Sequence, residues 1–265
     1  MDVDRYRRRL GDDGPTAPSL ETLIRLQRAH LRRVPFENLD IPLGRPIVLE
    51  PDALFAKIVG HRRGGFCYEL NGLFAGLLEA LGFAPALLAA RVYGDGQPGP
   101  EFDHMLLLLD LDGPWIADVG FGDSFVEPLP LGPGVRRQDF ADYRLRATAE
   151  GWVLDQRQHG ADWEPQYVFT LSPHPLAAFE PMCEYQQTSP RSGFTRKSVC
   201  SRLTRRGRVT IANGRLIMTV DGERDERPVD GPEELRALLR EHFGLELDDD
   251  APVERLLRPG VPPPA

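Results

Sequence analysis

The sequence of 265 residues lacks the features that mark secreted, zinc-binding and membrane proteins. Its three cysteines, Cys67, Cys183 and Cys200, are odd in number and too widely spaced for a disulfide framework or a zinc site. The N-terminus has no apolar stretch of the kind found in signal peptides. The most apolar region, residues 73–92, is interrupted by Glu79, Gly82 and Pro85, which argues against a membrane span. These absences predict a cytoplasmic protein with reduced thiols.

Lysine is nearly absent, and acidic residues outnumber basic ones. Two lysines stand against 30 arginines, and the net charge is −8. A negative balance argues against nucleic acid as the main partner. The charge is unevenly distributed, because residues 191–220 (the basic segment) carry eight basic side chains and no acidic one. This segment is either the solvated face of exposed strands or a region that attracts an anionic ligand.

The first third of the chain has the apolar spacing of helices. Ser19 fits the N-cap of a first helix, and residues 35–40 after it are predicted to form a loop. Further helices are predicted over residues 51–59 and 67–81. In the second of these, apolar side chains recur at i, i+3, i+4 and i+7, and a glycine follows the last of them.

From residue 86 onward the apolar period changes from 3.6 to 2, which is typical of strands. Strands are predicted over residues 86–93, 104–110, 115–119, 143–148, 151–156, 164–171 and 198–220, the last divided by turns at Arg206-Gly207 and Asn213-Gly214. A final helix is predicted over residues 232–243, and the proline-rich end, residues 259–265, is predicted to fray. This order of elements indicates an α+β fold, in which a helical bundle precedes an antiparallel barrel or sandwich and a small mixed region.

Cys67 follows two glycines and a phenylalanine at the predicted start of a helix. The unpaired N–H groups and the dipole of a helix N-terminus favour a thiolate, so this position is predicted to lower the pKa of the thiol. The spacing also places Cys67 on the apolar face, three residues before Leu70. The alternative interpretation is a small buried residue that packs in the core. A base beside the thiol would favour the catalytic interpretation.

His104 and Asp118 are the candidates for such a base and its partner. An aspartate in an apolar strand is costly to bury unless it is paired. The two residues lie on strands joined by a predicted hairpin, so the length of the loop decides whether they share a face. A two-residue turn at Asp112-Gly113 would put them on opposite faces, whereas a three-residue loop over 111–113 with Gly113 left-handed puts them on the same face. We therefore predict an odd loop or a bulge there.

Taken singly, a histidine in a strand is more often structural than catalytic. Together, Cys67, His104 and Asp118 supply a nucleophile, a base and a residue that orients the base, which is what thiol-dependent acyl transfer requires. The thiolate attacks an acyl carbonyl, the imidazole carries the proton, and the carboxylate fixes the tautomer of the ring. The sequence shows no metal-ligand pattern, so no metal is expected.

Five segments resemble the arylamine N-acetyltransferase family. They are RGGFCYELN at residues 63–71, PFENLD at residues 35–40, the strand that begins at His104, DVGFG at residues 118–122 and SPRSGFT at residues 189–195. The resemblance implies a catalytic triad of Cys67, His104 and Asp118 of the papain/transglutaminase kind, with acetyl-CoA as the acyl-donor substrate and no metal.

The resemblance also implies three domains and a ping-pong reaction. The domains are a helical domain over residues 1–83 that carries the cysteine, a β-barrel domain over residues 84–188 that carries the histidine and aspartate, and an α/β lid domain over residues 189–265. The acetyl group passes from acetyl-CoA to the cysteine and then to an arylamine, hydrazine or hydroxylamine.

A substrate pocket is implied by the same resemblance. Phe36, Val92, Phe121 and Phe194 are expected to line it, because aromatic acceptors need flat apolar walls. Gly120 is expected to let the acyl group or the pantetheine arm approach the backbone. Cations of the basic segment would steer CoA, which carries several phosphate charges, towards the nucleophile.

Two other functions stay open at this point. An amide synthase of the same family would use the same triad, but would take a long polyketide acyl chain from a carrier protein and close it onto an aromatic amine. A papain- or transglutaminase-like cysteine hydrolase would share the triad, but the segments at residues 35–40 and 189–195 do not support it. We expect a monomer or homodimer that acts on small molecules, with neither nucleic acid nor a membrane as a partner.

Overall fold

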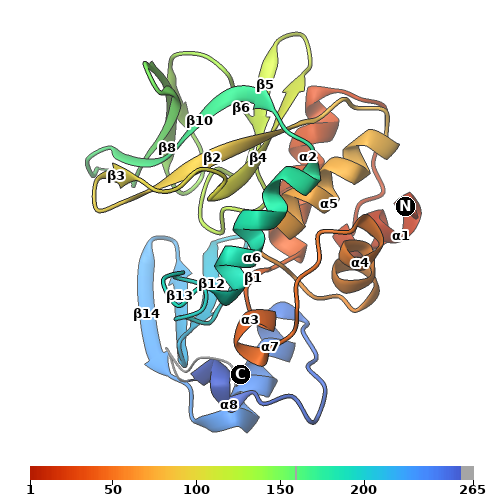
Figure 1. Cartoon of the computed structure of the whole chain (residues 1–265), viewed down its shortest axis with the longest axis vertical. Helices are drawn as coiled ribbons and strands as arrows, with labels where there is room; N and C mark the ends of the chain where they lie inside the picture. The colour runs from red at the N-terminus through yellow and green to blue at the C-terminus, as the bar shows by residue number, and fades with distance from the viewer. Residues whose placement is uncertain (159, 258–265) are drawn as a thin grey trace.

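The computed structural model describes residues 1–158 and 160–257, and the chain forms three packed regions (Figure 1). The N-terminal helices lie on the right of the view, a large curved sheet lies at the upper left, and a smaller sheet with the C-terminal helices lies at the bottom. The helical elements are α1 (Val3–Leu10), α2 (Leu20–Arg33), α3 (Asp40–Leu43), α4 (Pro51–Phe55), a π-helical turn (Ala56–Gly60), α5 (Cys67–Ala80), a 3-10 turn (Leu176–Phe179), α6 (Glu180–Thr188), α7 (Gly231–Phe243) and α8 (Glu254–Leu257). The end predicted to fray, residues 259–265, lies outside the described residues.

Two antiparallel sheets account for the strands. These are β1 (Phe36–Glu37), β2 (Ala86–Gly94), β3 (Gln97–Pro98), β4 (His104–Asp110), β5 (Pro114–Ala117), β6 (Leu129–Pro130), β7 (Val135–Arg137), β8 (Asp142–Thr148), β9 (Gly151–Arg157), β10 (Glu164–Pro173), β11 (Val199–Leu203), β12 (Gly207–Ala212), β13 (Arg215–Val220) and β14 (Glu223–Pro228). The larger sheet has the order β6-β5-β4-β2-β10-β9-β8-β7, with β3 beside β2, and it curves into a nearly closed barrel. The smaller sheet has the order β1-β11-β12-β13-β14. The predicted α+β fold with an antiparallel barrel is confirmed.

Local signals in the sequence set the helix boundaries. Ser19 caps α2, because its Oγ accepts a hydrogen bond from the N–H of Thr22 at 3.1 Å. Helix α5 matches its predicted range to within one residue, and Gly82 after it takes φ +89°. The helix predicted over residues 51–59 is instead divided, since α4 widens into a π-helical turn at residues 56–60. Apolar spacing does not distinguish these two kinds of helix over so short a segment.

Residues 35–40, predicted to be a loop, instead form β1 and the start of α3. Strand β1 pairs with β11, which belongs to the basic segment. Asn38 strengthens this junction, because its Nδ2 donates to the backbone oxygens of Phe194 at 2.9 Å and Lys197 at 2.8 Å. The loop prediction was wrong because a strand of two residues has no readable period and its partner lies far away in the sequence. The pairing brings the N-terminal region against one wall of the site described below.

A buried network of charges fixes the backbone that leads into α5. Arg63 contacts Glu37 at 2.8 Å and Asp40 at 2.9 Å. Lys57 contacts Asp40 at 2.7 Å and Glu69 at 2.6 Å. Burial raises the pKa of Glu69 to about 7, against the attraction of Lys57. Buried charges are stable only when each has a partner, so these contacts hold the segment before α5 in one position.

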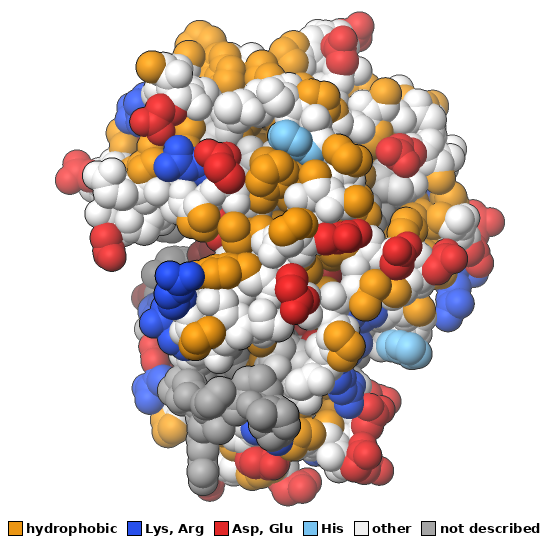
Figure 2. Space-filling view, in the orientation of Figure 1, with side chains coloured by type: hydrophobic (Ala, Val, Ile, Leu, Met, Phe, Trp, Pro, Cys, Tyr) orange, Lys and Arg blue, Asp and Glu red, His pale blue; other side chains and the backbone are white. Residues whose placement is uncertain are grey.

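The surface is indented between the two sheets. Figure 2 shows the indentation at the left of the molecule, between β3 above and β14 below, with basic side chains along its lower side. Acidic side chains are scattered over the rest of this face. Among the described residues, no helix combines the length and the apolar character needed to cross a membrane.

Candidate active site

The hairpin of β4 and β5 has the odd loop that the sequence predicts. The pairing of the two strands leaves residues 111–113 as a three-residue loop. Gly113 has a positive φ of +125°, as predicted. Asp112 also has a positive φ, of +52°, so two residues of the loop rather than one have positive φ. An odd loop places His104 and Asp118 on the same face of the hairpin. The catalytic interpretation depends on an odd number of residues in this loop, and that prediction is confirmed.

Asp118 is buried, and its carboxylate accepts four hydrogen bonds. Nε2 of His104 lies 2.7 Å from Oδ2, and the hydroxyl of Tyr167 donates to the same oxygen at 3.2 Å. Oδ1 accepts from Nδ2 of Asn71 at 2.9 Å and from the N–H of Gly120 at 2.8 Å. A carboxylate can only accept, so His104 carries its proton on Nε2 and keeps the lone pair of Nδ1 for a substrate or a thiol.

Three residues that support this pair were not predicted from the sequence, namely Gln27, Asn71 and Tyr167. Gln27 accepts from the N–H of Asp118 at 3.3 Å through its Oε1. Asn71 reaches the carboxylate from α5 and also donates to the backbone oxygen of Met105 at 2.6 Å. A polar residue within the apolar run of α5 is a signal that could have identified Asn71. Tyr167 carries no such signal, because tyrosine is common in strands.

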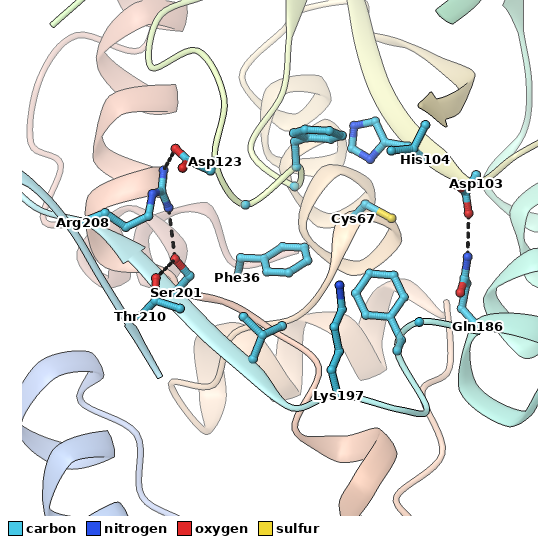
Figure 3. Close-up of a pocket in the computed structure, with 17 residues that line it drawn as sticks. Phe36, Cys67, Asp103, His104, Asp123, Gln186, Lys197, Ser201, Arg208 and Thr210 are labelled. Carbon is cyan, nitrogen blue, oxygen red and sulfur yellow. Dashed lines mark hydrogen bonds and ion pairs between the residues drawn. The ribbon is translucent and has the colours of Figure 1, made fainter. Parts of the chain in front are cut away.

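Cys67 is the first residue of α5, and its side chain faces the same cavity as His104 (Figure 3). The residue is only 4% exposed. Burial raises the pKa of the thiol well above its ordinary value, and the nearby Asp103 and Cys183 raise it further. The predicted lowering of this pKa is wrong, because desolvation outweighs the effect of the helix N-terminus. Such a thiol ionises only when a neighbouring base takes its proton and stays beside it as a cation.

The cavity has a volume of about 520 Å³ and receives residues from all three regions of the chain. It is lined by all five residues predicted from the sequence to form the substrate pocket: Phe36, Val92, Gly120, Phe121 and Phe194. The ring of Phe121 lies 5.1 Å from that of His104, and the rings of Phe36 and Phe194 lie 6.3 Å apart. Asp118 lies behind the imidazole, outside the lining. The fold thus brings together all the predicted site residues.

Lys197 and Arg208 are the basic residues of the basic segment that line this cavity. Nζ of Lys197 lies 5.0 Å from the centroid of the Phe194 ring, and Figure 3 shows the side chain extending towards the thiol. Burial lowers the pKa of Lys197. Arg208 contacts Asp123 at 3.0 Å and donates to Oγ of Ser201 at 3.3 Å. The cavity therefore has two cations beside its aromatic walls, and one of them is already paired.

The fold and the site define a protein with a Cys-His-Asp triad. A cysteine at the start of a helix lines the same cavity as a histidine on a barrel strand, and a buried aspartate holds that histidine, as in papain- and transglutaminase-like proteins. Within residues 1–158 and 160–257, no group of three or more His, Cys, Asp or Glu side chains is placed to hold a metal ion.

Comparison with known proteins gives the family. A family model described as N-acetyltransferase matches residues 19–251. The arylamine N-acetyltransferase of Mycolicibacterium smegmatis is 35% identical over 258 residues, which cover 94% of each chain. Proansamycin X synthase of Amycolatopsis mediterranei is 32% identical over 248 residues, covering 90% of this chain and 95% of that one. The structure of Mycobacterium marinum arylamine N-acetyltransferase in complex with CoA is 30% identical in sequence and superposes with a TM-score of 0.88. The match covers 96% of this chain and 97% of that chain. The chain belongs to the arylamine N-acetyltransferase family and is a transferase.

Proposed function

We propose that the protein is an arylamine N-acetyltransferase that moves an acetyl group from acetyl-CoA to an arylamine, arylhydrazine or arylhydroxylamine through a thioester on Cys67. The observation that carries this proposal is that Cys67 and His104 face one cavity while Asp118 is buried behind the imidazole. Relatives named arylamine N-acetyltransferase along nearly the whole chain support it, as does the complex of one of them with CoA.

The first half-reaction loads the enzyme. Nδ1 of His104 takes the proton of the Cys67 thiol, and the thiolate attacks the thioester carbonyl of acetyl-CoA. The tetrahedral intermediate collapses and expels the thiolate of CoA, which takes the proton from the imidazolium. The enzyme then carries the acetyl group as a thioester on Cys67. One thioester replaces another, so the step is close to thermoneutral. Because burial raises the pKa of the Cys67 thiol, the reactive thiolate forms as an ion pair with the imidazolium.

The second half-reaction transfers the acetyl group to the acceptor. The amine nitrogen attacks the acetyl carbonyl, His104 accepts the proton that the nitrogen loses, and the thiolate of Cys67 leaves and is reprotonated. Asp118 stabilises the imidazolium that forms in both steps and keeps Nδ1 directed into the cavity. The rings of Phe121 and Phe194 provide flat apolar walls for an aromatic acceptor.

Gly120 offers a test of how closely this site is packed. A Cβ on Gly120 would lie 2.7 Å from Nδ2 of Asn71 and 2.8 Å from Cα of Cys67. Gly120→Ala is therefore expected to push the nucleophile out of position and to lower kcat/KM for acetyl transfer by about 100-fold. Gly193→Ala is the matched control, because Gly193 also lines the cavity but a Cβ there meets nothing within 4 Å. Equal activities for the two variants would contradict the packing argument.

The proposed reaction is tested by initial-rate kinetics with acetyl-CoA and an aniline or an aryl hydrazide. Free CoA and the acetylated amine are measured separately at several concentrations of each substrate. A ping-pong transferase gives parallel double-reciprocal lines, equal amounts of the two products, and steady-state release of CoA only when amine is present. Steady release of CoA and acetate without amine would instead identify a hydrolase. Absence of both products would reject the proposal.

A second candidate is an amide synthase, and the similarity to proansamycin X synthase favours testing it. The same residues would serve this reaction, so the acyl donor decides between the two. We expect acetyl-CoA to give a higher kcat/KM than a long-chain acyl thioester with the same aromatic amine. The opposite order would favour the amide synthase, and propionyl-CoA and malonyl-CoA complete the series of donors.

The domain boundaries and the setting of the protein are also proposals. We propose the helical, barrel and lid domains over residues 1–83, 84–188 and 189–265. One cluster of buried apolar side chains is centred in each domain, and the first cluster also includes Met105 and Leu107 of the barrel. The three cysteines are free and buried, which supports a cytoplasmic location with reduced thiols. A monomer or homodimer without nucleic acid or membrane partners is consistent with small-molecule substrates.

A further inference from the structure

The basic segment is divided between different surroundings. Side chains alternate along β11, so Ser201 lines the active-site cavity while Arg202 lines another. Arg206 and Arg215 have carboxylate partners, which are Asp221 and Glu226 respectively. Arg202 and its neighbour in the following turn, Arg205, contribute neither to the active site nor to these pairs, and the function proposed above does not use them.

These two arginines line a second cavity, which has a volume of about 420 Å³. It lies between the end of β11 and the C-terminal ends of α1 and α2. Arg32 and Arg33, in the last turn of α2, line its other side. The remaining lining residues are Leu10, Gly11, Ala29, Leu203 and Thr204. Four guanidinium groups therefore surround one hollow that has no acidic residue in its lining.

None of these four side chains has a partner in the described part of the chain: they form no ion pair and donate no hydrogen bond there. The Nε atoms of Arg32 and Arg202 are buried from solvent and still unpaired. Charged donors are costly to bury without an acceptor. The arginines do not cap the nearby helix ends either, since none of them bonds to a carbonyl group. Arg33 and Arg205 are exposed to solvent, so the two buried Nε atoms are the donors that need an acceptor, and they point to one that comes from outside the chain.

The positive charges of the arginines that line this cavity are only partly offset by the nearby ends of helices. Burial lowers the pKa of Arg9 to about 10, and the charges of Arg62, Arg202 and Arg33 lower it as well. Burial, together with the charge of Arg33, also lowers the pKa of Arg202. The C-terminal ends of α1 and α2 each carry about half a negative charge. They offset about one of the four positive charges of the lining residues, whereas the guanidinium of Arg9 beside them already donates to the backbone carbonyls of Ile58 and Arg62.

We propose that this second cavity binds an organic diphosphate, held by Arg32, Arg33, Arg202 and Arg205. Guanidinium groups match phosphate oxygens in geometry, often through two hydrogen bonds at once, and a diphosphate brings about three negative charges to a region of comparable positive charge. The cavity is larger than an inorganic anion requires and falls within the range of small-ligand sites. Its apolar side chains, Leu10, Ala29 and Leu203, would contact the organic part of the ligand.

The proposed site is distinct from the active site. The two cavities share no lining residue, although both lie against β11. An organic diphosphate in the second cavity therefore binds while CoA occupies the first. CoA itself contains a diphosphate, so the test must separate the two sites.

The test is isothermal titration calorimetry of the full chain with ADP and, separately, with inorganic pyrophosphate, in a chloride buffer free of phosphate and sulfate. We expect one equivalent of ADP to bind to the wild-type protein with saturating CoA present, and binding to weaken as salt is added. Arg205→Gln removes one exposed guanidinium and is expected to weaken binding about tenfold, with Arg202→Gln having at least that effect. Pyrophosphate is expected to bind more weakly than ADP.

Arg206→Gln is the matched control, because Arg206 is next in sequence but is paired with Asp221. This variant is expected to keep the wild-type affinity for ADP. Arg205→Gln is also expected to melt at the wild-type temperature or above it without ligand, because it relieves repulsion between like charges. Absence of ADP binding at millimolar concentration, displacement of ADP by CoA, or equal affinity in Arg205→Gln and wild type would each overturn the proposal.

Discussion

Replacing Cys67 with alanine is expected to abolish acetyl transfer, lowering kcat/KM by at least about 10⁴-fold. The side chain faces the cavity beside the histidine, and no other cysteine lines that cavity. The wild-type protein incubated with acetyl-CoA alone should gain about 42 Da, the mass of an acetyl group replacing a proton. Intact-mass spectrometry followed by peptide mapping should place this group on Cys67, and an arylamine should remove it.

Cys200→Ala is the matched control for this experiment. Cys200 is as deeply buried as Cys67, but it packs in the core of the smaller sheet and not in the cavity. Its variant is expected to lose some stability and to keep both the acetyl adduct and the transfer activity. Transfer by Cys67→Ala at more than a hundredth of the wild-type rate, or an adduct on a different cysteine, would overturn the assignment of the nucleophile.

Asp118→Asn is expected to lower kcat/KM by about 10³- to 10⁴-fold with the fold intact. The carboxylate accepts from His104 and Tyr167 on one oxygen and from Asn71 and Gly120 on the other. An asparagine must turn its NH₂ group towards one of these pairs of donors, so one pair loses its acceptor. If the NH₂ group faces His104, the imidazole adopts the wrong tautomer and Nδ1 no longer serves as the base.

A loss of stability accompanies this change and has to be separated from the loss of chemistry. An unpaired buried donor costs about 1–3 kcal/mol, so the melting temperature of the Asp118→Asn variant should fall. Asp155→Asn is the control, because Asp155 is equally buried and contacts Arg144 and Arg146 but does not line the cavity. It should lose stability and keep its activity. An Asp118→Asn variant that folds and retains activity within tenfold of wild type would show that the aspartate does not orient the base.

The active-site hairpin shows what a sequence can establish. Two residues of the right chemistry are not enough, since a histidine and an aspartate on neighbouring strands meet only when the loop between them has the right parity. The aspartate and glycine at positions 112 and 113 allow both a two-residue and a three-residue loop. The requirement that Asp118 have a buried partner selects the second, which the structure confirms. In this hairpin, the cost of burying the Asp118 charge without a partner was enough to predict the length of the loop.

Other parts of the site could not be read in this way. The pKa of the Cys67 thiol depends on how completely the surrounding residues exclude water, and that depends on tertiary packing. The hydrogen bond from Tyr167 comes from a strand whose alternation gives no sign of it. The net charge of the basic segment was evident, but the division of its arginines between two cavities depends on where each lies in β11, in β12 or in the turn between them. Composition gives the number of charges and not their partners.

The pairing of β1 with β11 has a consequence for how the protein is made. Val199 donates a hydrogen bond to Asn38, which lies 161 positions earlier in the chain. Contacts between such distant residues close late, because a long loop must be ordered before they can form. During synthesis, the helices and the barrel can assemble while β11 has not yet left the ribosome. The thiol and its histidine then meet before the wall formed by β1 and β11 is complete, so the newly made chain passes through a stage in which its reactive centre is open to water.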